Sequence, residues 1–500
     1  MTFLIRFSGD LSTKRGRAFA RFRSRLASNL RDALNRADLA FELQTARSRF
    51  FLEAPQEAAE ILPTIFGIQS FSRAVTLSWE GFDDLIRDGE ACFSDAVRDK
   101  TFAVRVRRGR VRGQVDFRSA QVERELGARL FPLASGVDLT NPEVTVRIEL
   151  DPGAAHYFSE VIPCAAGLPL AGEGRCLTLI SGGIDSAVAA WLMLKRGISV
   201  DYLFYNLGGS DHENQVLEVI NILARRWSHG SRPRLWLVDL RRQVSELRER
   251  SPESLWQVEL KRLMLHGAEV VAANAGAGAI VTGEAIGQVS SQTFDNLAVI
   301  EAAAHRPVLR PLLTFDKSEI VALARRIGTY ESSAQVPEYC ALHGRAPSTS
   351  ASLRDLERVE AGLNLDTLLA DAREAPVLDL RATAPLPGGG ERPLGVDAIP
   401  DGARVVDLRS PAAFETWHYP DAVRMDYLEA VRASAHFDAA KTYVVCCEVE
   451  FKSADVAERL RAAKKTAFFF KGGTSRLLKW AESQDLVASS AVSPAVRDSN

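Results

Sequence analysis

The stretch 176–205 constrains the fold more strongly than any other part of the sequence. An apolar strand is expected over 176–180, then a glycine-containing turn, then a helix over 186–196 that Gly197 is placed to end. The alternation continues, with helices between further strands expected at 199–205, 234–239 and 279–283. Because crossover helices of this kind join parallel strands, the pattern predicts a doubly wound α/β domain with a parallel sheet.

The turn Ser181–Ser186, with the sequence SGGIDS, joins the first strand to its helix. Glycines let a backbone approach a phosphate closely, and the free amides of a first helical turn bind anions. No lysine follows as in a Walker loop, and an acid near phosphates requires a cation. Asp185 is therefore predicted to help hold Mg²⁺ on ATP. The alternative is an ordinary glycine turn with a helix cap at Ser186.

Length and composition predict several globular domains. The chain has 500 residues, which is too many for one ordinary core and predicts three or four domains. With 46% hydrophobic and 25% charged residues, it is neither a disordered chain nor a collagen-like one. No run of 18 apolar residues and no secretion signal occurs, so we expect a cytoplasmic protein with no membrane partner. The six cysteines form no C-x-x-C pair and do not predict a disulfide framework.

Several strings carry a family resemblance. SGGIDS resembles the SGGxDS signature of the PP-loop ATP pyrophosphatases, which cleave ATP between the α- and β-phosphates to adenylate a substrate. The chain as a whole resembles the tRNA 4-thiouridine synthase / thiamine-biosynthesis sulfurtransferase family, because further family strings occur in order: GLP at 167–169, TGE at 282–284, GQVSSQT at 287–293, DKSEI at 316–320 and IGTYE at 327–331. The family's ATP lies across the carboxyl ends of the strands.

This resemblance implies a set of site residues. It places Lys317 in the catalytic centre with Asp185, where a lysine can neutralise charge on the leaving pyrophosphate. Without the resemblance, Lys317 reads as an exposed lysine at a helix start and Gln292 as a loop amide. The implied ATP contacts are Leu179, Ile180, Ser181, Gly182, Gly183, Asp185, Ser186, Phe204, Tyr205, Lys261, Gly283 and Gln292.

The first third of the chain carries two basic clusters. Residues 1–36 hold nine Lys/Arg against two acids, and residues 98–112 hold seven against one. These clusters suggest a polyanion partner, and the alternative is a solvated charged face. Residues 1–78 resemble a ferredoxin-like α+β domain, and 79–165 resemble a THUMP domain, a type that binds tRNA. The phosphate contacts expected here are Arg105, Arg107 and Arg108, and the expected elements include helices over 14–36 and 81–100 and a strand over 66–78.

The last α/β unit, residues 396–486, resembles a rhodanese domain. A strand over 442–447, a short loop and a helix over 453–463 place Cys447 among free amides at a helix N-terminus, which favours a thiolate and so a persulfide. The spacing from Cys447 to Ser453 matches the C-x-x-G-x-x-S pattern of relatives and selects Cys447 over Cys446. Glu450 replaces the usual glycine, so a degenerate rhodanese domain remains an alternative.

A second cysteine, Cys340, resembles the family's synthetase-domain cysteine, although a lone cysteine in this setting is more often buried and inert. The resemblance implies that a persulfide on Cys447, loaded by a cysteine desulfurase, supplies sulfur. It also implies that Cys340 then forms a redox disulfide with Cys447. In the family the same persulfide can serve thiazole synthesis for thiamine, which brings in a thiamine-pathway sulfur-carrier protein as a further partner.

The sequence therefore predicts an ATP- and Mg²⁺-dependent tRNA uridine 4-sulfurtransferase, in a family that modifies position 8 of tRNA. One alternative is a PP-loop tRNA-modifying enzyme whose rhodanese domain is inactive and whose sulfur comes from a separate donor. Another is a non-catalytic tRNA-binding protein. The expected division is a ferredoxin-like domain at 1–78, a THUMP domain at 79–165, a PP-loop domain at 166–383, a linker at 384–395, a rhodanese-like domain at 396–486 and a tail at 487–500.

Overall fold

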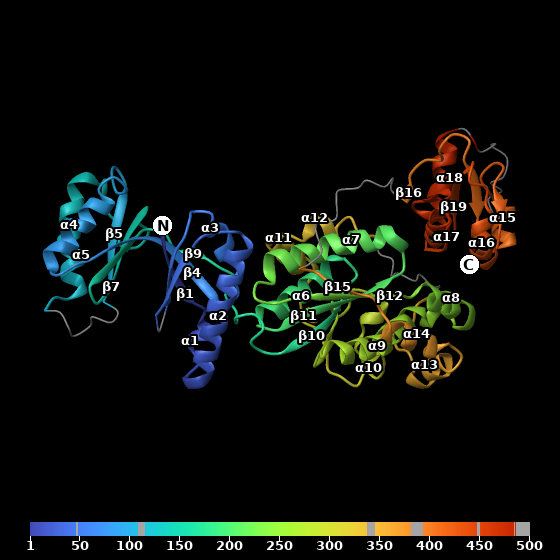
Figure 1. The fold of residues 1–500 in the computed structure, drawn as a ribbon, viewed down its shortest axis with the longest axis horizontal. Coiled ribbons are helices and arrows are strands. Elements are labelled where there is room, and N and C mark those ends of the chain that lie inside the picture. The colour runs from blue at the N-terminus through green and yellow to red at the C-terminus, as the bar shows by residue number, and fades with distance from the viewer. Residues whose placement is uncertain are drawn as a thin grey trace, which may run out of the picture. The chain divides into compact units, whose positions relative to one another are not determined.

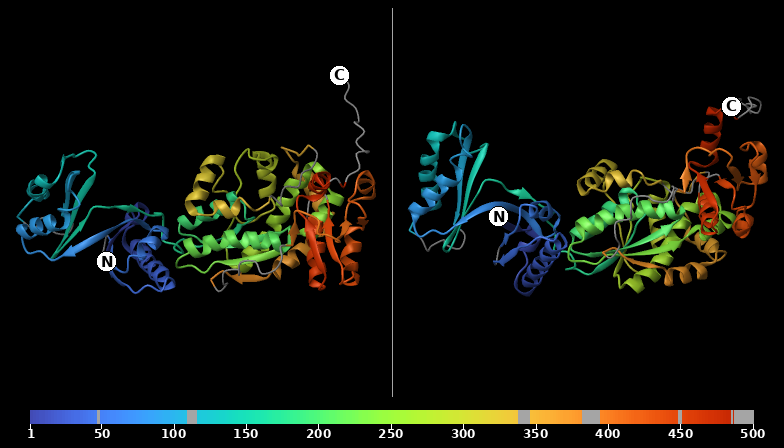
Figure 2. Two further views of the ribbon diagram at one scale, coloured as in Figure 1. Left: turned by 90° about the horizontal axis from the view of Figure 1, so that it is seen from above. Right: turned by 45° about the horizontal axis from the view of Figure 1, so that its top comes forward.

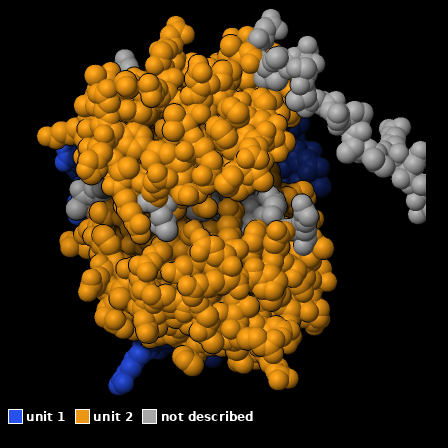
Figure 3. All heavy atoms as spheres, turned by 90° about the vertical axis from the view of Figure 1, so that its right-hand side faces the viewer, with its two compact units in different colours: residues 1–174, 193–199, 226–231 blue, residues 175–192, 200–225, 232–500 orange. Residues whose placement is uncertain are grey.

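The computed structural model describes residues 1–46, 49–108, 116–337, 346–381, 394–447, 451–484 and 486. The chain forms two compact units, shown in different colours in Figure 3. The N-terminal unit comprises residues 1–174, 193–199 and 226–231, and the C-terminal unit comprises the rest. Among the described residues, no helix is both long and apolar enough to cross a membrane.

One continuous sheet runs through the N-terminal unit (Figure 1). The long strand β4 (Ile68–Leu77) pairs with β1 (Thr2–Phe7) along one part of its length and with β8 (Ala154–Phe158) along another. The segments expected to be ferredoxin-like and THUMP domains therefore share a sheet. The order is β2-β3-β1-β4-β8-β7-β5-β6, with β2 at Glu42–Thr45, β3 at Arg49–Glu53, β5 at Thr101–Arg108, β6 at Gly136–Val137 and β7 at Val144–Asp151, while β9 (Ile162–Pro163) pairs with β4.

The arginine-rich helix expected over 14–36 is present as α2 (Gly16–Arg36), which buries Phe22, Leu26 and Leu30 on one face. The helix expected over 81–100 is shorter and ends at Phe93, because turns follow and Asp99 adopts a left-handed φ of 57°. The strand expected from residue 66 begins at Ile68, after Gly67 at a φ of 99°. The other helices of this unit are α1 (Gly9–Ser12), α3 (Ala58–Ile61), α4 (Phe82–Phe93) and α5 (Ser119–Leu130).

The larger sheet of the C-terminal unit confirms the predicted doubly wound, parallel architecture. Its order is β14-β13-β10-β11-β12-β15, with β10 at Arg175–Leu179, β11 at Ser199–Asn206, β12 at Arg234–Asp239, β13 at Ala279–Val281, β14 at Val308–Leu309 and β15 at Val377–Asp379. β13 pairs in parallel with β10 and β14, and only the edge strand β15 is antiparallel to its neighbour β12. The chain runs outward from β10 through β11 to β12 and then returns to β13 beside β10. This reversal is a topological switch point, where doubly wound sheets bind ligands at the carboxyl edge.

Helices lie on both faces of this sheet, with α9 and α10 on the opposite face from α7 (Figures 1 and 2). The apolar face of α9 is buried against β10, and Tyr205 of β11 lies in the same core. The helices are α6 (Ile184–Lys195), α7 (Gly209–Ile222), α8 (Arg241–Arg250), α9 (Trp256–Ala275), α10 (Phe294–Glu301), α11 (Lys317–Ile327), α12 (Tyr330–Ser333), α13 (Leu353–Glu360) and α14 (Leu365–Arg373).

A second parallel sheet in the C-terminal unit confirms the last predicted α/β module. Its order is β16-β20-β19-β17-β18, from β16 at Gly395–Val396, β17 at Arg404–Asp407, β18 at Val423–Arg424, β19 at Thr442–Cys446 and β20 at Thr466–Phe470. Apolar side chains alternate between two cores: α17 (Phe451–Ala462) packs on one face and α18 (Gly473–Ser483) on the other. The remaining helices are α15 (Pro411–Thr416) and α16 (Tyr427–Ala433).

Candidate active site

The loop between β10 and α6 has the geometry that its sequence predicted. Gly182 adopts a φ of 80°, and a Cβ on it would lie 2.9 Å from the Val216 side chain, so a glycine is required. The Ser186 hydroxyl donates to the carbonyl of Gly183 (3.0 Å) and accepts from the amide of Ser181 (3.3 Å), which closes the loop. Helix α6 begins at Ile184, two residues earlier than expected. Asp185 therefore lies in its first turn.

Gly283, which follows β13, lies against the start of α6. A Cβ there would be 2.8 Å from the backbone of Asp185 and Ser186. The segment after β13 is thus in contact with the loop between β10 and α6. A larger residue at position 283 would push the loop away, which explains physically why a glycine stands there.

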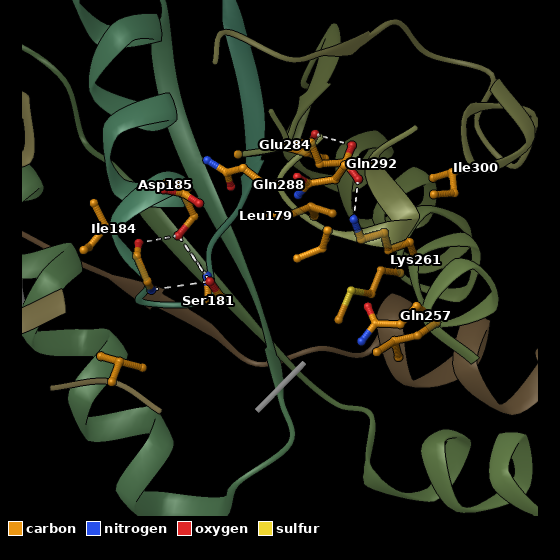
Figure 4. Close-up of a pocket in the computed structure, with 18 of the residues that line it drawn as sticks. Leu179, Ser181, Ile184, Asp185, Gln257, Lys261, Glu284, Gln288, Gln292 and Ile300 are labelled. Carbon is orange, nitrogen blue, oxygen red and sulfur yellow. Dashed lines mark hydrogen bonds and ion pairs between the residues drawn. The ribbon is translucent and has the colours of Figure 1, made fainter. Parts of the chain in front are cut away.

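A cavity of about 1070 Å³ opens at this edge of the sheet (Figure 4). Ser181 and Asp185 lie on one side of it, and Lys261 and Gln257 on the other. The predicted site residues that line it are Leu179, Ser181, Gly183, Asp185, Ser186, Lys261, Gly283, Gln292 and Lys317. The volume is slightly above the usual range for ligand sites, and the wall beyond the loop is largely apolar, with Leu260, Met264, Leu265 and Ile300.

Four of the predicted ATP contacts do not have side chains among the lining residues. Phe204 and Tyr205 are buried, and the Tyr205 hydroxyl donates to the carbonyl of Met264 (2.6 Å). Ile180 and Gly182 are buried too. Any contact of Phe204 or Tyr205 with a nucleotide would have to use the backbone, because their side chains serve the core.

Lys317 and Asp185, the two predicted catalytic residues of this module, form an ion pair. The Lys317 ammonium lies 2.7 Å from Asp185 Oδ1, although the residues are far apart in the chain. Asp316 caps α11 with its side chain, so Lys317 is the first residue of that helix. The side chain of Lys317 is 57% exposed, which leaves its ammonium able to change partner when a phosphate arrives.

The carboxylate of Asp185 fits the predicted Mg²⁺. Among the described residues, no group of three or more His, Cys, Asp or Glu side chains forms a metal site. Mg²⁺ that is bound with a nucleotide needs no such cage, since it uses one or two carboxylates, water and the substrate phosphates. A single carboxylate beside the phosphate loop is consistent with that mode.

Glu284 is a site residue whose role the sequence did not reveal. Its buried carboxylate accepts from Lys261 (2.8 Å) and Arg310 (2.9 Å) and from the hydroxyl of Thr282 (3.0 Å). Burial alone would raise the pKa of Glu284, but the two cations hold it below its ordinary value. Lys261 is thereby fixed in the cavity wall. The family string TGE at 282–284 indicated that this position matters, but it does not show which cations the glutamate binds.

His212 on α7 was also missed. It lines the cavity and packs edge-on against Phe204, with ring centroids 4.6 Å apart. Burial lowers its pKa to about 4, and a hydrogen bond with the Ser181 backbone offsets only part of this effect. The imidazole is therefore neutral at ordinary pH, and its hydrogen bond with the Ser181 backbone helps to hold the SGGIDS loop in place.

The cysteine module brings Cys447 and Ser453 together. Cys447 directly follows β19 and is buried, and its Sγ lies 3.3 Å from Ser453 Oγ in the first turn of α17. Cys446 points to the other core, where burial and the Asp407 charge raise its pKa well above the ordinary value. Helix α17 begins at Phe451, two residues earlier than expected. Cys340, Glu450 and most of the expected linker lie outside the described residues.

A cavity of about 250 Å³ in the N-terminal unit is lined by four arginines, Arg6, Arg105, Arg107 and Arg147, with one acid, Glu149. Glu149 pairs with Arg6 (3.1 Å) and with Arg49. The pKa of Arg147 is lowered by burial and by the neighbouring arginines, and its buried Nε has no hydrogen-bond partner among the described residues.

Two of the three predicted phosphate-binding arginines, Arg105 and Arg107, are thus in this cavity. The third, Arg108, donates to the carbonyl of Phe117 instead. Arg6 and Arg147 were not singled out from the sequence.

The fold and the cavity at its switch point define an α/β nucleotide-binding enzyme of the PP-loop type. Family models match along the chain: the ThiI ferredoxin-like domain at 2–72, the THUMP domain at 81–156, the thiamine biosynthesis protein (ThiI) at 171–365 and the rhodanese-like domain at 396–479. The chain is 36% identical over 456 residues to a tRNA sulfurtransferase of Pyrobaculum aerophilum, covering 91% of this chain and 93% of that protein. It therefore belongs to the tRNA sulfurtransferase family.

Two other relatives agree with this family. A tRNA sulfurtransferase of Shewanella amazonensis is 34% identical over 464 residues, covering 90% of this chain and 95% of that protein. Among solved structures, a 4-thiouridine synthetase in complex with RNA and bound ATP matches with a TM-score of 0.67 and 29% identity. That match covers 75% of this chain and 98% of the synthetase.

Proposed function

We propose that this chain is an ATP-dependent tRNA sulfurtransferase that converts a tRNA uridine, at position 8 as in the family, to 4-thiouridine. The observation that carries the proposal is the cavity at the switch point, where the SGGIDS loop meets the Lys317–Asp185 pair. The relatives named tRNA sulfurtransferase and the solved synthetase with ATP and RNA support it.

In this proposal ATP binds with its phosphates on the loop and its base against the apolar wall. The loop amides and the first turn of α6 bind phosphate oxygens. Asp185 would hold Mg²⁺, which supplies positive charge beside the phosphates. Lys317 can then leave Asp185 and neutralise the departing pyrophosphate. The predicted contacts Ile180, Gly182, Phe204 and Tyr205 would act through the backbone or through packing.

The first reaction is adenylation of the base. The uridine O4 attacks the α-phosphorus of ATP, a C4–O–P linkage forms, and the bond to the β-phosphate bridge oxygen breaks. Pyrophosphate leaves with that oxygen and its electron pair. The N3 proton of the base is released to solvent, so the charges balance.

The second reaction transfers sulfur from Cys447. A cysteine desulfurase loads Cys447 as a persulfide, and its terminal sulfur attacks C4 and displaces AMP. The thiolate of Cys340 then attacks Sγ of Cys447, the sulfur–sulfur bond breaks, and thiouridine leaves with its sulfur. The Cys340–Cys447 disulfide that remains takes two electrons from an external dithiol, which returns both cysteines to thiols.

The N-terminal unit would bind the tRNA. Four arginines around one carboxylate leave a net positive cavity that suits an RNA phosphate. Such contacts position a folded RNA by its backbone and shape and carry no base information.

The test combines purified protein, tRNA, ATP, Mg²⁺ and a desulfurase supplied with labelled cysteine. We expect tRNA-dependent ATP–pyrophosphate exchange, labelled 4-thiouridine in the nucleoside mass spectrum, and label on the Cys447 peptide. Cys447→Ser should stop sulfur transfer, and Cys446→Ser serves as the matched control with a mild effect. Exchange without label on either cysteine would indicate a separate sulfur donor. If neither ATP–pyrophosphate exchange nor 4-thiouridine is detected, the result would favour the alternative of a non-catalytic tRNA-binding protein.

A further inference from the structure

A buried ion pair joins the cysteine module, residues 394–484, to the larger sheet of the C-terminal unit. Arg241, the first residue of α8, is 11% exposed, and its Nη1 lies 2.8 Å from Oδ1 of Asp455 and 3.3 Å from Oε2 of Glu458. Asp455 is 1% exposed and lies in α17, which packs against α7. The contact is therefore largely shielded from water, unlike most surface ion pairs.

Each partner is also held by hydrogen bonds within its own part of the chain. Asp239, at the end of β12, binds Nε and Nη2 of Arg241 and orients the planar guanidinium. On the other side, Asp455 accepts from the hydroxyl of Tyr427 (2.7 Å) and from Arg459 (3.0 Å) within its own module. Pre-oriented charged groups lose little freedom when they pair, so this arrangement favours a specific docked state.

The contact lies at the functional edge of the larger sheet. Helices α7 and α8 begin after the carboxyl ends of β11 and β12, and the loops that line the nucleotide cavity follow β10 and β13 at this same edge. Asp455 is two residues beyond Ser453, which contacts Cys447. The docked helix is therefore the one whose first turn lies against the sulfur-carrying cysteine.

The fit at the start of α7 is tight. Gly209 has a φ of 74°, and a Cβ on it would lie 3.0 Å from Glu458 Oε2 and 3.9 Å from the Cβ of Ala454. A side chain at position 209 would press on α17. The surface formed by Gly209 and Arg241 is thus complementary to α17 in both shape and charge.

We propose that the Gly209–Arg241 surface is the docking site of the cysteine module and that Arg241 anchors it during sulfur delivery to the nucleotide cavity. The assignment to sulfur delivery rests on the proposed function, but the docking itself does not. Arg241 acts here as a positioning residue, because it is not among the described residues that line the nucleotide cavity.

The first test traps the docked state in the full chain. The Cβ separation of 3.9 Å between positions 209 and 454 falls within the range for a disulfide. Gly209→Cys with Ala454→Cys should therefore cross-link under mild oxidation, and peptide mass mapping distinguishes this bond from bonds of the native cysteines. Adding Arg241→Glu should slow the cross-link at least tenfold. Arg242→Glu is the matched control, because the neighbouring Arg242 is 64% exposed and pairs with Glu246 of its own helix.

A second measurement avoids the strain of a cysteine at position 209. Hydrogen exchange of the full chain should show faster exchange in both α7 and α17 with Arg241→Glu, and unchanged exchange with Arg242→Glu. The proposal is overturned if Arg241→Glu leaves hydrogen exchange in α7 and α17 as in the wild type, whether or not the cross-link forms.

The third measurement separates docking from chemistry. In a single turnover from preloaded persulfide, Arg241→Glu should thiolate tRNA at least tenfold more slowly, while persulfide loading and ATP–pyrophosphate exchange keep their wild-type rates. Unchanged thiolation would overturn the role in delivery. If the wild type itself shows neither persulfide loading nor ATP–pyrophosphate exchange, the proposed function fails, and the cross-link and hydrogen exchange then decide whether the docking site exists.

Discussion

The two cavities differ in how their cations are balanced. In the C-terminal unit each lining lysine faces a carboxylate: Lys317 faces Asp185, and Lys261 faces Glu284. In the N-terminal unit four lining arginines surround Glu149, the one acid among the described residues that line this cavity. A balanced cavity can exchange one ion pair for another as a charged ligand enters and leaves, whereas an unbalanced one attracts and holds a polyanion. The difference suits turnover in the first cavity and RNA binding in the second.

The largest expected effect tests the balanced cavity. Asp185→Ala should lower the thiolation rate at least a thousandfold, because it removes the carboxylate that would hold Mg²⁺ and leaves Lys317 without its partner. Thiolation and tRNA affinity are measured in parallel, and the affinity should not change. Asp295→Ala is the control, since Asp295 is an exposed acid in the first turn of another helix, α10. A variant with normal turnover would contradict the role proposed for Asp185.

Removing the buried carboxylate of the same cavity should lower the stability of the protein. Glu284→Ala leaves Lys261 and Arg310 without their shared acceptor, which should lower the free energy of unfolding by about 3–5 kcal/mol. Denaturant unfolding measures the change. Glu301→Ala removes the exposed partner of the same Arg310 and should cost at most about 1 kcal/mol. Equal losses for the two variants would contradict the distinction between buried and exposed pairs.

The unbalanced cavity should respond in RNA affinity. Replacing Arg105 and Arg107 by Ala should weaken tRNA binding and flatten its salt dependence, since each lost phosphate contact lowers the slope of log affinity against log salt by roughly 0.7–0.9. Titrations at several salt concentrations give the slope, and ATP–pyrophosphate exchange at saturating tRNA should persist.

The control for this RNA test changes two arginines that are already paired. Arg87 pairs with Asp84 and Asp88, and Arg129 with Glu90 and Glu125. Arg87→Ala with Arg129→Ala should keep the wild-type slope. If the cavity variant also keeps it, the cavity is not part of the RNA surface.

The smallest effect concerns a carboxyl behind the wall of the nucleotide cavity. Burial and nearby Glu360 raise the pKa of Glu259. Burial would raise the pKa of Glu360 too, but His266 and Arg262 hold it below the ordinary value. As pH rises, the unfolded chain loses the Glu259 proton at the ordinary pKa of a glutamate, whereas the folded protein keeps this proton to higher pH. The stability that this proton contributes is therefore lost as pH rises from that ordinary pKa through the raised pKa.

Glu259→Gln carries no charge at this position. Its free energy of unfolding should be about 1–2 kcal/mol higher than that of the wild type at pH 9 and equal to it near pH 4. Thermal or denaturant unfolding at both pH values provides the comparison. A difference that does not depend on pH would show that the pKa of Glu259 is not raised in the folded protein.

Much of the fold follows from local patterns in the sequence. The alternation of apolar strands and helices after residue 175 predicted the parallel sheet, and the SGGIDS turn predicted the loop between its first strand and helix. The spacing of Cys447 and Ser453 placed both at one strand–helix junction, and the structure brings them within 3.3 Å. These features depend on residues close in sequence, where side-chain periodicity and turn chemistry determine the backbone.

The tertiary structure alone decided which distant residues meet. Lys317 follows β14, and it reaches Asp185 because β14 pairs with β13, which returns beside β10. Glu284 joins Lys261 to Arg310 across three separate segments. The side chains of Phe204 and Tyr205 turn into the core, although their strand end was predicted to contact ATP. Strand order, not local pattern, determines such contacts. The strand order is stabilised by burying apolar surfaces of segments that are far apart in the sequence, so the local pattern does not show which of them meet.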